Sequence, residues 1–137
     1  QVYHPSAGYK FMHKYEGRKL TEKMFPLAVQ QFFFDGERVR TDIIEDFLPK
    51  LQEVRETTAS NGFNLYSTSL LLVYEGSQCA SAAYSGPIEE PRERTRLCMI
   101  DFAHAFQADD TDEIDDGYQF GIGNFIDILE SILQKSS

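Results

Sequence analysis

The sequence predicts a single α+β domain with the order hairpin, two helices, antiparallel strand pair and C-terminal helix. Segments whose apolar residues recur at helical spacing alternate with short β-prone runs that end at turn residues. The chain has 137 residues, which is enough for one hydrophobic core and too few for two comfortable ones. It contains neither a repeat nor an internal linker, so we expect one structural unit over residues 1–137.

The first predicted element is a β-hairpin over residues 1–15. Val2-Tyr3 and the run from Tyr9 to Tyr15 are β-prone, Pro5–Gly8 supplies the turn, and residues 16–19 close the element. This charged segment is consistent with two roles, a solvated edge that discourages aggregation or an anion-binding surface. Its basic side chains are Lys10, Lys14, Arg18 and Lys19, together with His4 and His13.

Two helices are expected next. Thr21 has the side chain of an N-cap, and helical spacing continues to Phe32 before Asp35-Gly36 ends the helix. Pro26 is tolerated only near a first turn, so it either lies there or moves the start of the helix to its own position. The second helix is expected from Thr41 to Thr57. Its apolar stripe consists of Ile43, Ile44, Phe47, Leu48, Leu51 and Val54.

Two buried strands and a final helix complete the predicted fold. Residues 65–74 form an apolar run with a polar entry, residues 78–94 have the composition of a loop, and residues 97–102 form a second apolar run. We expect the two runs to pair as antiparallel strands. The last helix covers residues 117–134. Its expected inner face consists of Phe120, Phe125, Ile128, Leu129, Ile132 and Leu133.

Composition and charge exclude several classes of protein. The net charge of −9 counts against a nucleic-acid or acidic-membrane binder. The longest apolar stretch, Leu70 to Tyr74, is too short to span a bilayer. Cys79 and Cys98 do not make a disulfide framework, which indicates a reducing compartment, and we expect the cytoplasm and/or the nucleus.

Several familiar catalytic patterns are missing from the sequence. No Gly-rich phosphate loop is present, the serines lack the Gly-x-Ser-x-Gly elbow, and the three histidines and two cysteines lack zinc-ligand spacing. These absences count against a P-loop or Rossmann nucleotide site, a serine hydrolase and a zinc site.

The stretch from Leu97 to His104 contains the strongest candidate for chemistry. An apolar strand that ends on Asp101 can deliver a metal-binding carboxylate to a cleft; alternatively, Asp101 caps a turn and His104 packs beside it. Mg²⁺ uses one or two carboxylates and takes water and phosphates in its other positions, so one Asp suits it. Asp101-Phe102 also resembles the metal-binding segment of protein kinases, but Ala103 follows and no His-Arg-Asp loop precedes it, which argues against a protein kinase.

Residues 109–116 are strongly acidic. We interpret them as a solvated loop whose last carboxylates cap the following helix. A calcium loop is the alternative, but the ligand spacing and glycine of an EF-hand are absent.

Four blocks of the chain, in this order, resemble the inositol polyphosphate kinase family. The resemblance implies the C-terminal lobe of that kinase fold, which is SAICAR synthase-like. Within the family, Ala103-His104 after Asp101-Phe102 is similar to inositol polyphosphate multikinases and inositol hexakisphosphate kinases, and the short connection after His104 favours a multikinase. The blocks are His-Lys-Tyr-Glu-Gly-Arg-Lys-Leu-Thr at 13–21, Ser-Leu-Leu-Leu-Val-Tyr-Glu-Gly at 69–76, Met-Ile-Asp-Phe-Ala-His at 99–104 and Asp-Gly-Tyr-Gln-Phe-Gly at 116–121.

The resemblance also implies roles for individual residues. Asp101 matches the aspartate that holds Mg²⁺ on the ATP phosphates, and His104 matches a histidine that contacts the inositol phosphate near the transferred group. Lys14 falls where the family places a substrate-contacting side chain. Ser69 belongs to the Ser-Leu-Leu block, which supports the site and is needed for activity. Arg18 matches a family position whose role is either substrate binding or structural.

One family feature is absent from these residues. The signature Pro-x-x-x-Asp-x-Lys-x-Gly does not occur, and relatives carry it, together with the nucleotide-gripping lobe, upstream of the matched region. We therefore expect a C-terminal part of an ATP- and Mg²⁺-dependent inositol polyphosphate kinase, inactive without an upstream half. The alternatives are an inositol hexakisphosphate kinase that makes pyrophosphates, or a non-catalytic interaction module derived from the fold.

Overall fold

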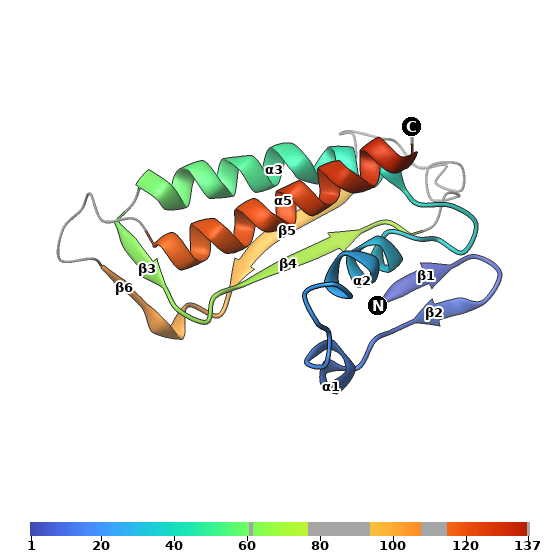
Figure 1. Ribbon diagram of the computed structural model, residues 1–137, viewed down its shortest axis with the longest axis horizontal. Coiled ribbons are helices and arrows are strands. Elements are labelled where there is room, and N and C mark those ends of the chain that lie inside the picture. The colour runs from blue at the N-terminus through green and yellow to red at the C-terminus, as the bar shows by residue number, and fades with distance from the viewer. Residues whose placement is uncertain (61, 77–93, 108–114, 137) are drawn as a thin grey trace, which may run out of the picture.

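Two long helices and a strand pair form the body of the protein. The computed structural model describes residues 1–60, 62–76, 94–107 and 115–136. Helices α3 (Thr41–Ser60) and α5 (Asp116–Ser136) lie side by side over one face of the antiparallel strands β4 (Ser69–Tyr74) and β5 (Thr95–Ile100) (Figure 1). This arrangement confirms the α+β class and the expected antiparallel pairing.

The shorter elements lie at the two ends of this body. Near the N-terminus, a hairpin and two short helices lie at one end, and a second short strand pair lies at the other (Figure 1). These elements are β1 (Val2–His4), β2 (Gly8–Lys10), α1 (Lys14–Gly17), α2 (Phe25–Phe32), β3 (Phe63–Leu65), the 3-10 helix η1 (Phe102–His104) and β6 (Ala105–Gln107).

The core forms where α2, α3 and α5 meet. Side chains three and four residues apart share one helix face, so each helix contributes a stripe of apolar residues. Full burial of one such side chain stabilises the fold by about 1.5–3 kcal/mol. From the strands, Leu70, Leu72, Tyr74 and Leu97 pack against this core. Its buried members are Val29, Phe33, Ile43, Ile44, Phe47, Leu51, Ile122, Ile126, Leu129 and Ile132.

One long antiparallel ribbon is interrupted by a break that we call the bend, residues 66–68 and 101–104. On one side of the bend, β4 pairs with β5, beginning with Ser69 opposite Ile100; on the other, β3 pairs with β6, with Leu65 opposite Ala105. Three residues of one strand therefore face four of the other, so the strand that carries Asp101 has one extra residue, as in a β-bulge.

The N-terminal segment departs from the predicted hairpin after Lys10. The hairpin forms, but residues 14–17 make helix α1 instead of continuing the second strand. The reason is a local capping box: Glu16 Oε2 accepts a hydrogen bond from the His13 amide at 2.8 Å, and His13 Nδ1 accepts one from the Tyr15 amide at 3.4 Å.

Helix α2 begins later than predicted. Thr21 is not its N-cap, because its carbonyl accepts turn hydrogen bonds from the amides of Met24 and Phe25. The helix starts at Phe25, so Pro26 lies in the first turn, where its missing N–H removes no helical hydrogen bond. The helix ends at Phe32, as predicted, with Phe33 as its C-cap, and Gly36, which has a φ of 100°, lies in the turn that follows.

Two expectations about burial are wrong. The run 65–74 is not one buried strand: it divides at the bend, and the outer side chains of β4 are exposed, Leu71 by 45% and Val73 by 50%. On α5, Phe120 is 73% exposed, and Ile122 and Ile126 are buried instead. Because two residues along a helix are about 200° apart, Phe120 cannot share the face that Ile122 presents to the core.

Two predicted loops fall largely outside the described residues. Only Arg94 of residues 78–94 is described, and of the acidic segment 109–116 only Asp115 and Asp116 are described.

Among the helices of the described ranges, none combines the length and apolarity that a membrane crossing requires.

Candidate functional site

The bend brings together three of the five residues proposed from the sequence. Ser69 begins β4 opposite Ile100, Asp101 follows Ile100 directly, and His104 ends η1 one residue before β6. Ser69, Asp101 and His104 are all exposed. The antiparallel pairing therefore gathers residues 35 positions apart in the chain onto one exposed turn.

Asp101 has an unusual backbone. Its φ of 66° and ψ of 58° place it in the left-handed region, as does the φ of 61° at Ser67 across the bend. Asp tolerates this region better than most residues, and residues held there cluster at functional sites. Within the described residues the Asp101 carboxylate does not cap the turn that follows it, so the capping role considered from the sequence is not realised.

Asp115 fixes the bend against the start of α5. Its Oδ1 accepts a hydrogen bond from the Tyr118 amide at 2.9 Å, which caps the helix as predicted for the end of the acidic segment. Its Oδ2 accepts a second from the Leu65 amide at 2.7 Å, next to the bend. The second bond was not predicted, because no local pattern relates residues 50 positions apart.

A cavity of about 270 Å³ lies between the bend and α5. Thr68 and Tyr118 both line it, and their hydroxyl oxygens are buried without a hydrogen-bond partner among the described residues. Burial raises the pKa of Tyr118, and the nearby Asp115 carboxylate adds to this effect. Within the described residues, the Thr68 and Tyr118 hydroxyls therefore add no polar contact to this side of the bend.

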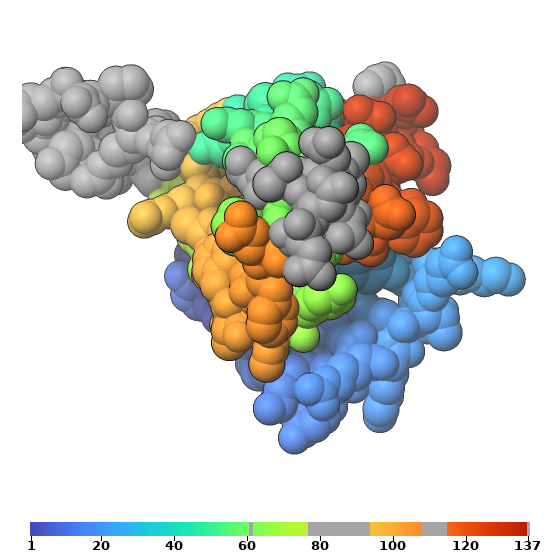
Figure 2. All heavy atoms as spheres, turned by 90° about the vertical axis from the view of Figure 1, so that its left-hand side faces the viewer, coloured from blue at the N-terminus to red at the C-terminus, as the bar shows by residue number. Residues whose placement is uncertain are grey.

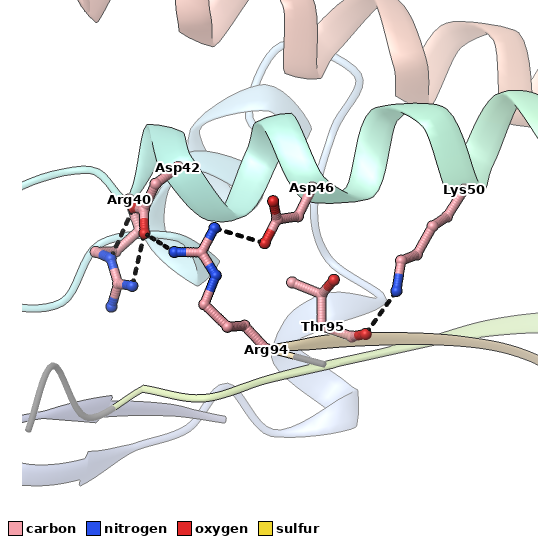
Figure 3. A network of polar contacts seen from close by, with 6 residues as sticks. All are labelled: Arg40, Asp42, Asp46, Lys50, Arg94 and Thr95. Carbon is pink, nitrogen blue, oxygen red and sulfur yellow. Dashed lines mark hydrogen bonds and ion pairs between the residues drawn. The ribbon is translucent and has the colours of Figure 1, made fainter. Parts of the chain in front are cut away.

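A polar network fixes the other end of β5 (Figure 3). Arg94 bridges Asp42 at 3.0 Å and Asp46 at 2.7 Å, and Lys50 Nζ donates to the Thr95 carbonyl at 2.7 Å. The buried Arg40 guanidinium donates two hydrogen bonds to Asp42, and these, with the charges of Arg40 and Arg94, lower the pKa of that carboxyl. The network ties β5 to α3, and so positions the strand that ends at Asp101.

Lys14 and Arg18 lie on a different element. Both are exposed on or beside α1, with Lys14 Nζ 5.2 Å and Arg18 Cζ 6.0 Å from the centre of the Tyr15 ring. Figure 1 shows α1 apart from the bend, and Figure 2 shows the N-terminal segment in blue below the yellow-orange strand residues. The structure therefore forms two clusters, a bend with Ser69, Asp101 and His104, and α1 with Lys14 and Arg18.

The outer face of the β4–β5 pair carries apolar side chains that lead towards Asp101, together with the exposed Arg96, which pairs with Val73. Leu71 and Val73 from β4 and Ile100 from β5 are exposed on the side away from the helices, and Leu71 pairs with Cys98. The sequence could not indicate this surface, because every residue from 70 to 73 is apolar and no alternation distinguishes the two faces.

A metal at Asp101 would need ligands from elsewhere. Among the described residues, no group of three His, Cys, Asp or Glu side chains lies close enough to hold an ion. A single exposed carboxylate fits an ion such as Mg²⁺, which keeps several water and phosphate ligands. In the described part of the chain, the donor set is thus compatible with a metal carried by a phosphate ligand, and it forms no pre-formed protein cage.

Comparisons with known proteins all find inositol phosphate kinases. The sequence profile described as inositol polyphosphate kinase matches residues 1–130. The chain is 35% identical to inositol hexakisphosphate kinase 3 of Mus musculus over 130 residues, covering 87% of this chain and 33% of that protein. It is 30% identical to inositol hexakisphosphate kinase 2 of Homo sapiens over 165 residues, covering 99% of this chain and 39% of that protein. The chain thus spans a third to two fifths of the length of these relatives.

Solved structures share the fold. An inositol phosphate multikinase from S. cerevisiae, in complex with ADP and Mn²⁺, superposes with a TM-score of 0.74 at 22% identity, covering 94% of this chain and 53% of that chain. A second inositol phosphate multikinase structure gives a TM-score of 0.73 at 22% identity, covering 96% and 59%.

Proposed function

The chain belongs to the inositol polyphosphate kinase family, and from that premise we propose that it is the C-terminal lobe of an ATP- and Mg²⁺-dependent kinase of soluble inositol polyphosphates. The nucleotide and the metal are supported by the ADP and Mn²⁺ in the S. cerevisiae multikinase structure. The residues that act are Asp101, His104 and Ser69 in the bend, with Lys14 and Arg18 on α1.

The observation that carries this proposal is the exposed Asp101 at the end of an apolar strand surface. A nucleotide has an apolar base at one end and charged phosphates at the other. The outer face of β4–β5, with Leu71 and Val73, suits the base, and Asp101 lies where that surface ends. The phosphates would then lie over the bend, within the same turn as His104.

Catalysis of phosphoryl transfer consists mainly of positioning and charge stabilisation. Mg²⁺, when bound, neutralises charge on the phosphates. Asp101 holds that ion in place, and its backbone conformation fixes the carboxylate outside the strand ladder. His104 binds a substrate phosphate near the transferred group, Ser69 supports the bend, and Lys14 and Arg18 bind other phosphates of the substrate.

The decisive experiment is Asp101→Asn, made in a polypeptide that joins this chain to an upstream half that supplies the signature Asp and Lys. We expect turnover to fall below detection while the thermal midpoint stays unchanged, because Asp101 is exposed and caps nothing in the described structure. Asp127→Asn, an equally exposed carboxylate on α5, is the matched control and should retain full activity. A near-normal rate for Asp101→Asn would contradict the assignment.

The nature of the acceptor group separates two versions of this function. The solved structures are of multikinases and the curated relatives are hexakisphosphate kinases. Inositol hexakisphosphate has no free hydroxyl, so its product must contain a pyrophosphate, whereas less phosphorylated inositols give an ordinary phosphate ester. Phosphorus NMR of the products from each substrate distinguishes a multikinase from a hexakisphosphate kinase.

A non-catalytic module is the second candidate. It is favoured by the acidic segment 109–116, whose charge does not suit a phosphorylated substrate. Calorimetry with ATP, Mg²⁺ and an inositol polyphosphate tests it. Binding of neither ligand, with the upstream half present, would support a scaffold role and contradict the kinase proposal.

A further inference from the structure

The Tyr15 ring contacts the cationic groups of Lys14 and Arg18, and we call these three residues the cation cluster. The ring centre is 5.2 Å from Lys14 Nζ and 6.0 Å from Arg18 Cζ, and the His13 ring stacks on it at 5.1 Å with an interplanar angle of 22°. The ring itself is 57% exposed. We propose that Tyr15 is a positioning residue that pre-organises Lys14 and Arg18 for the phosphate groups of an inositol polyphosphate.

An aromatic face can hold both cations because its π electrons attract positive charge within about 6 Å. Tyr15 and Arg18 are three residues apart and so share one face of the helical turn. Lys and Arg side chains lose considerable rotamer freedom when they bind a ligand. Contact with the ring restricts that freedom beforehand, and this lowers the entropy lost on binding.

The acidic residue of α1, Glu16, forms a hydrogen bond at the start of the helix. Glu16 is the only acid between His13 and Lys19, and its Oε2 accepts a hydrogen bond from the His13 amide at 2.8 Å. Its carboxylate is thus engaged at the start of the turn. This bond also fixes the backbone that carries Tyr15, so the cluster is defined by residues 13–18 alone.

The inference rests on the proposed function, because the phosphates come from the substrate assigned there. What the inference adds is the role of Tyr15, which binds no phosphate itself and acts through Lys14 and Arg18, which do. A merely structural role for Tyr15 predicts loss of folding when the ring is removed. A positioning role predicts weaker phosphate binding by a chain that is still folded.

The test is calorimetric titration with inositol hexakisphosphate, made in the polypeptide that joins this chain to an upstream half. Tyr15→Leu should weaken binding roughly fivefold, the loss expected for cation–π contacts at an exposed site. Tyr15→Phe keeps the π face and should bind like the unaltered chain. Tyr9→Leu is the matched control, because Tyr9 is 66% exposed and contacts Tyr3 instead of a cation.

NMR gives a second readout that does not depend on any ligand. The methylene protons next to the charged groups of Lys14 and Arg18 should show ring-current shifts that disappear in Tyr15→Leu and persist in Tyr15→Phe. Persistence of these shifts in Tyr15→Leu would overturn the inference, since the ring would then not hold the side chains.

The variant Lys14→Met/Arg18→Met separates failure of this inference from failure of the proposed function. In that background Tyr15→Leu should have no further effect on binding, because its effect passes through the two cations. If the double variant binds as tightly as the unaltered chain, or the unaltered chain does not bind, the proposed substrate site and the inference both fail. If the double variant binds weakly while Tyr15→Leu binds normally, the inference alone fails.

Discussion

The bend and the cation cluster are held in place by different means. The bend depends on partners far away in the sequence: Asp115 holds Leu65, and Arg94 and Lys50 join β5 to α3. Among the described residues, the hydrogen bonds and ring contacts that define the cation cluster all lie within residues 13–18. The proposed metal side of the site is therefore a product of tertiary structure, and the proposed phosphate side is a product of local sequence. The two should respond differently to mutation.

The largest effect on the bend is expected from Asp115→Ala. The change removes the cap of α5 and leaves the Leu65 amide without its acceptor, which together destabilise the fold by about 2–3 kcal/mol. Urea unfolding measures the loss. Asp116→Ala, the exposed neighbour, should change the free energy of unfolding by less than about 0.5 kcal/mol. If both variants lowered the free energy of unfolding equally, Asp115 would not be the residue that links α5 to the bend.

A smaller effect is expected at the far end of β4. Tyr74 Oη donates a 2.6 Å hydrogen bond to the Phe32 carbonyl, so Tyr74→Phe should lower the free energy of unfolding by about 1 kcal/mol at neutral pH. Burial raises the pKa of Tyr74 from 10.0 to about 12. Because the folded state holds this proton more tightly, the contribution is complete below pH 10 and is lost as the pH rises towards 12.

Chemical unfolding at pH 8 and at pH 11 checks this pH dependence. The difference in stability between the unaltered chain and Tyr74→Phe should shrink at the higher pH. A difference that stays constant between the two pH values would show that Tyr74 ionises alike in the folded and unfolded chains.

Tyr118→Phe should act in the opposite direction. The Tyr118 hydroxyl is buried without a partner in the described part of the chain, and an unpaired buried polar group costs about 1–3 kcal/mol. Its removal should leave stability unchanged or raise it by up to about 1 kcal/mol, measured by thermal unfolding. A clear loss of stability would mean that the Tyr118 hydroxyl has a hydrogen-bond partner.

The smallest effect on global stability is expected in the cation cluster. Glu16→Ala breaks the capping box of α1, but none of the residues of α1 is buried, so urea unfolding should change by less than about 0.5 kcal/mol. Hydrogen exchange should nevertheless become faster for the amides of residues 13–18. If Glu16→Ala lowered the free energy of unfolding as much as Asp115→Ala, the cation cluster and the bend would not differ in how they are held in place.

The sequence predicted those parts of the fold that are encoded locally. The apolar stripe of α3 contains its four buried residues, Ile43, Ile44, Phe47 and Leu51, because helical spacing is visible within one segment. The pairing of the two apolar runs was also predicted. The face of α5 was not, since Phe120 and Ile122 are equally apolar and only contact with α3 decides which is buried.

The candidate site shows the same division. Asp101, His104 and Ser69 were named from sequence blocks that resemble a family, and their roles there stay predictions. Their gathering at the bend followed only from strand pairing, and the support from Asp115 only from the folded chain. Helix α1 was not predicted because residues 9–15 are β-prone and His13 is not among the usual N-cap residues, so the His13–Glu16 capping box is apparent only in the structure.

The bend owes its existence to a mismatch of one residue. Four residues on the strand of Asp101 face three on the other, so the two ladders are out of step by a single position. With equal lengths the ribbon could run as one uninterrupted hairpin, straight and fully paired, and its Asp and His would alternate with their neighbours across a regular pleat. The length of the chain between Ile100 and Ala105 therefore decides whether this segment forms regular sheet or an exposed turn that presents Asp101 and His104.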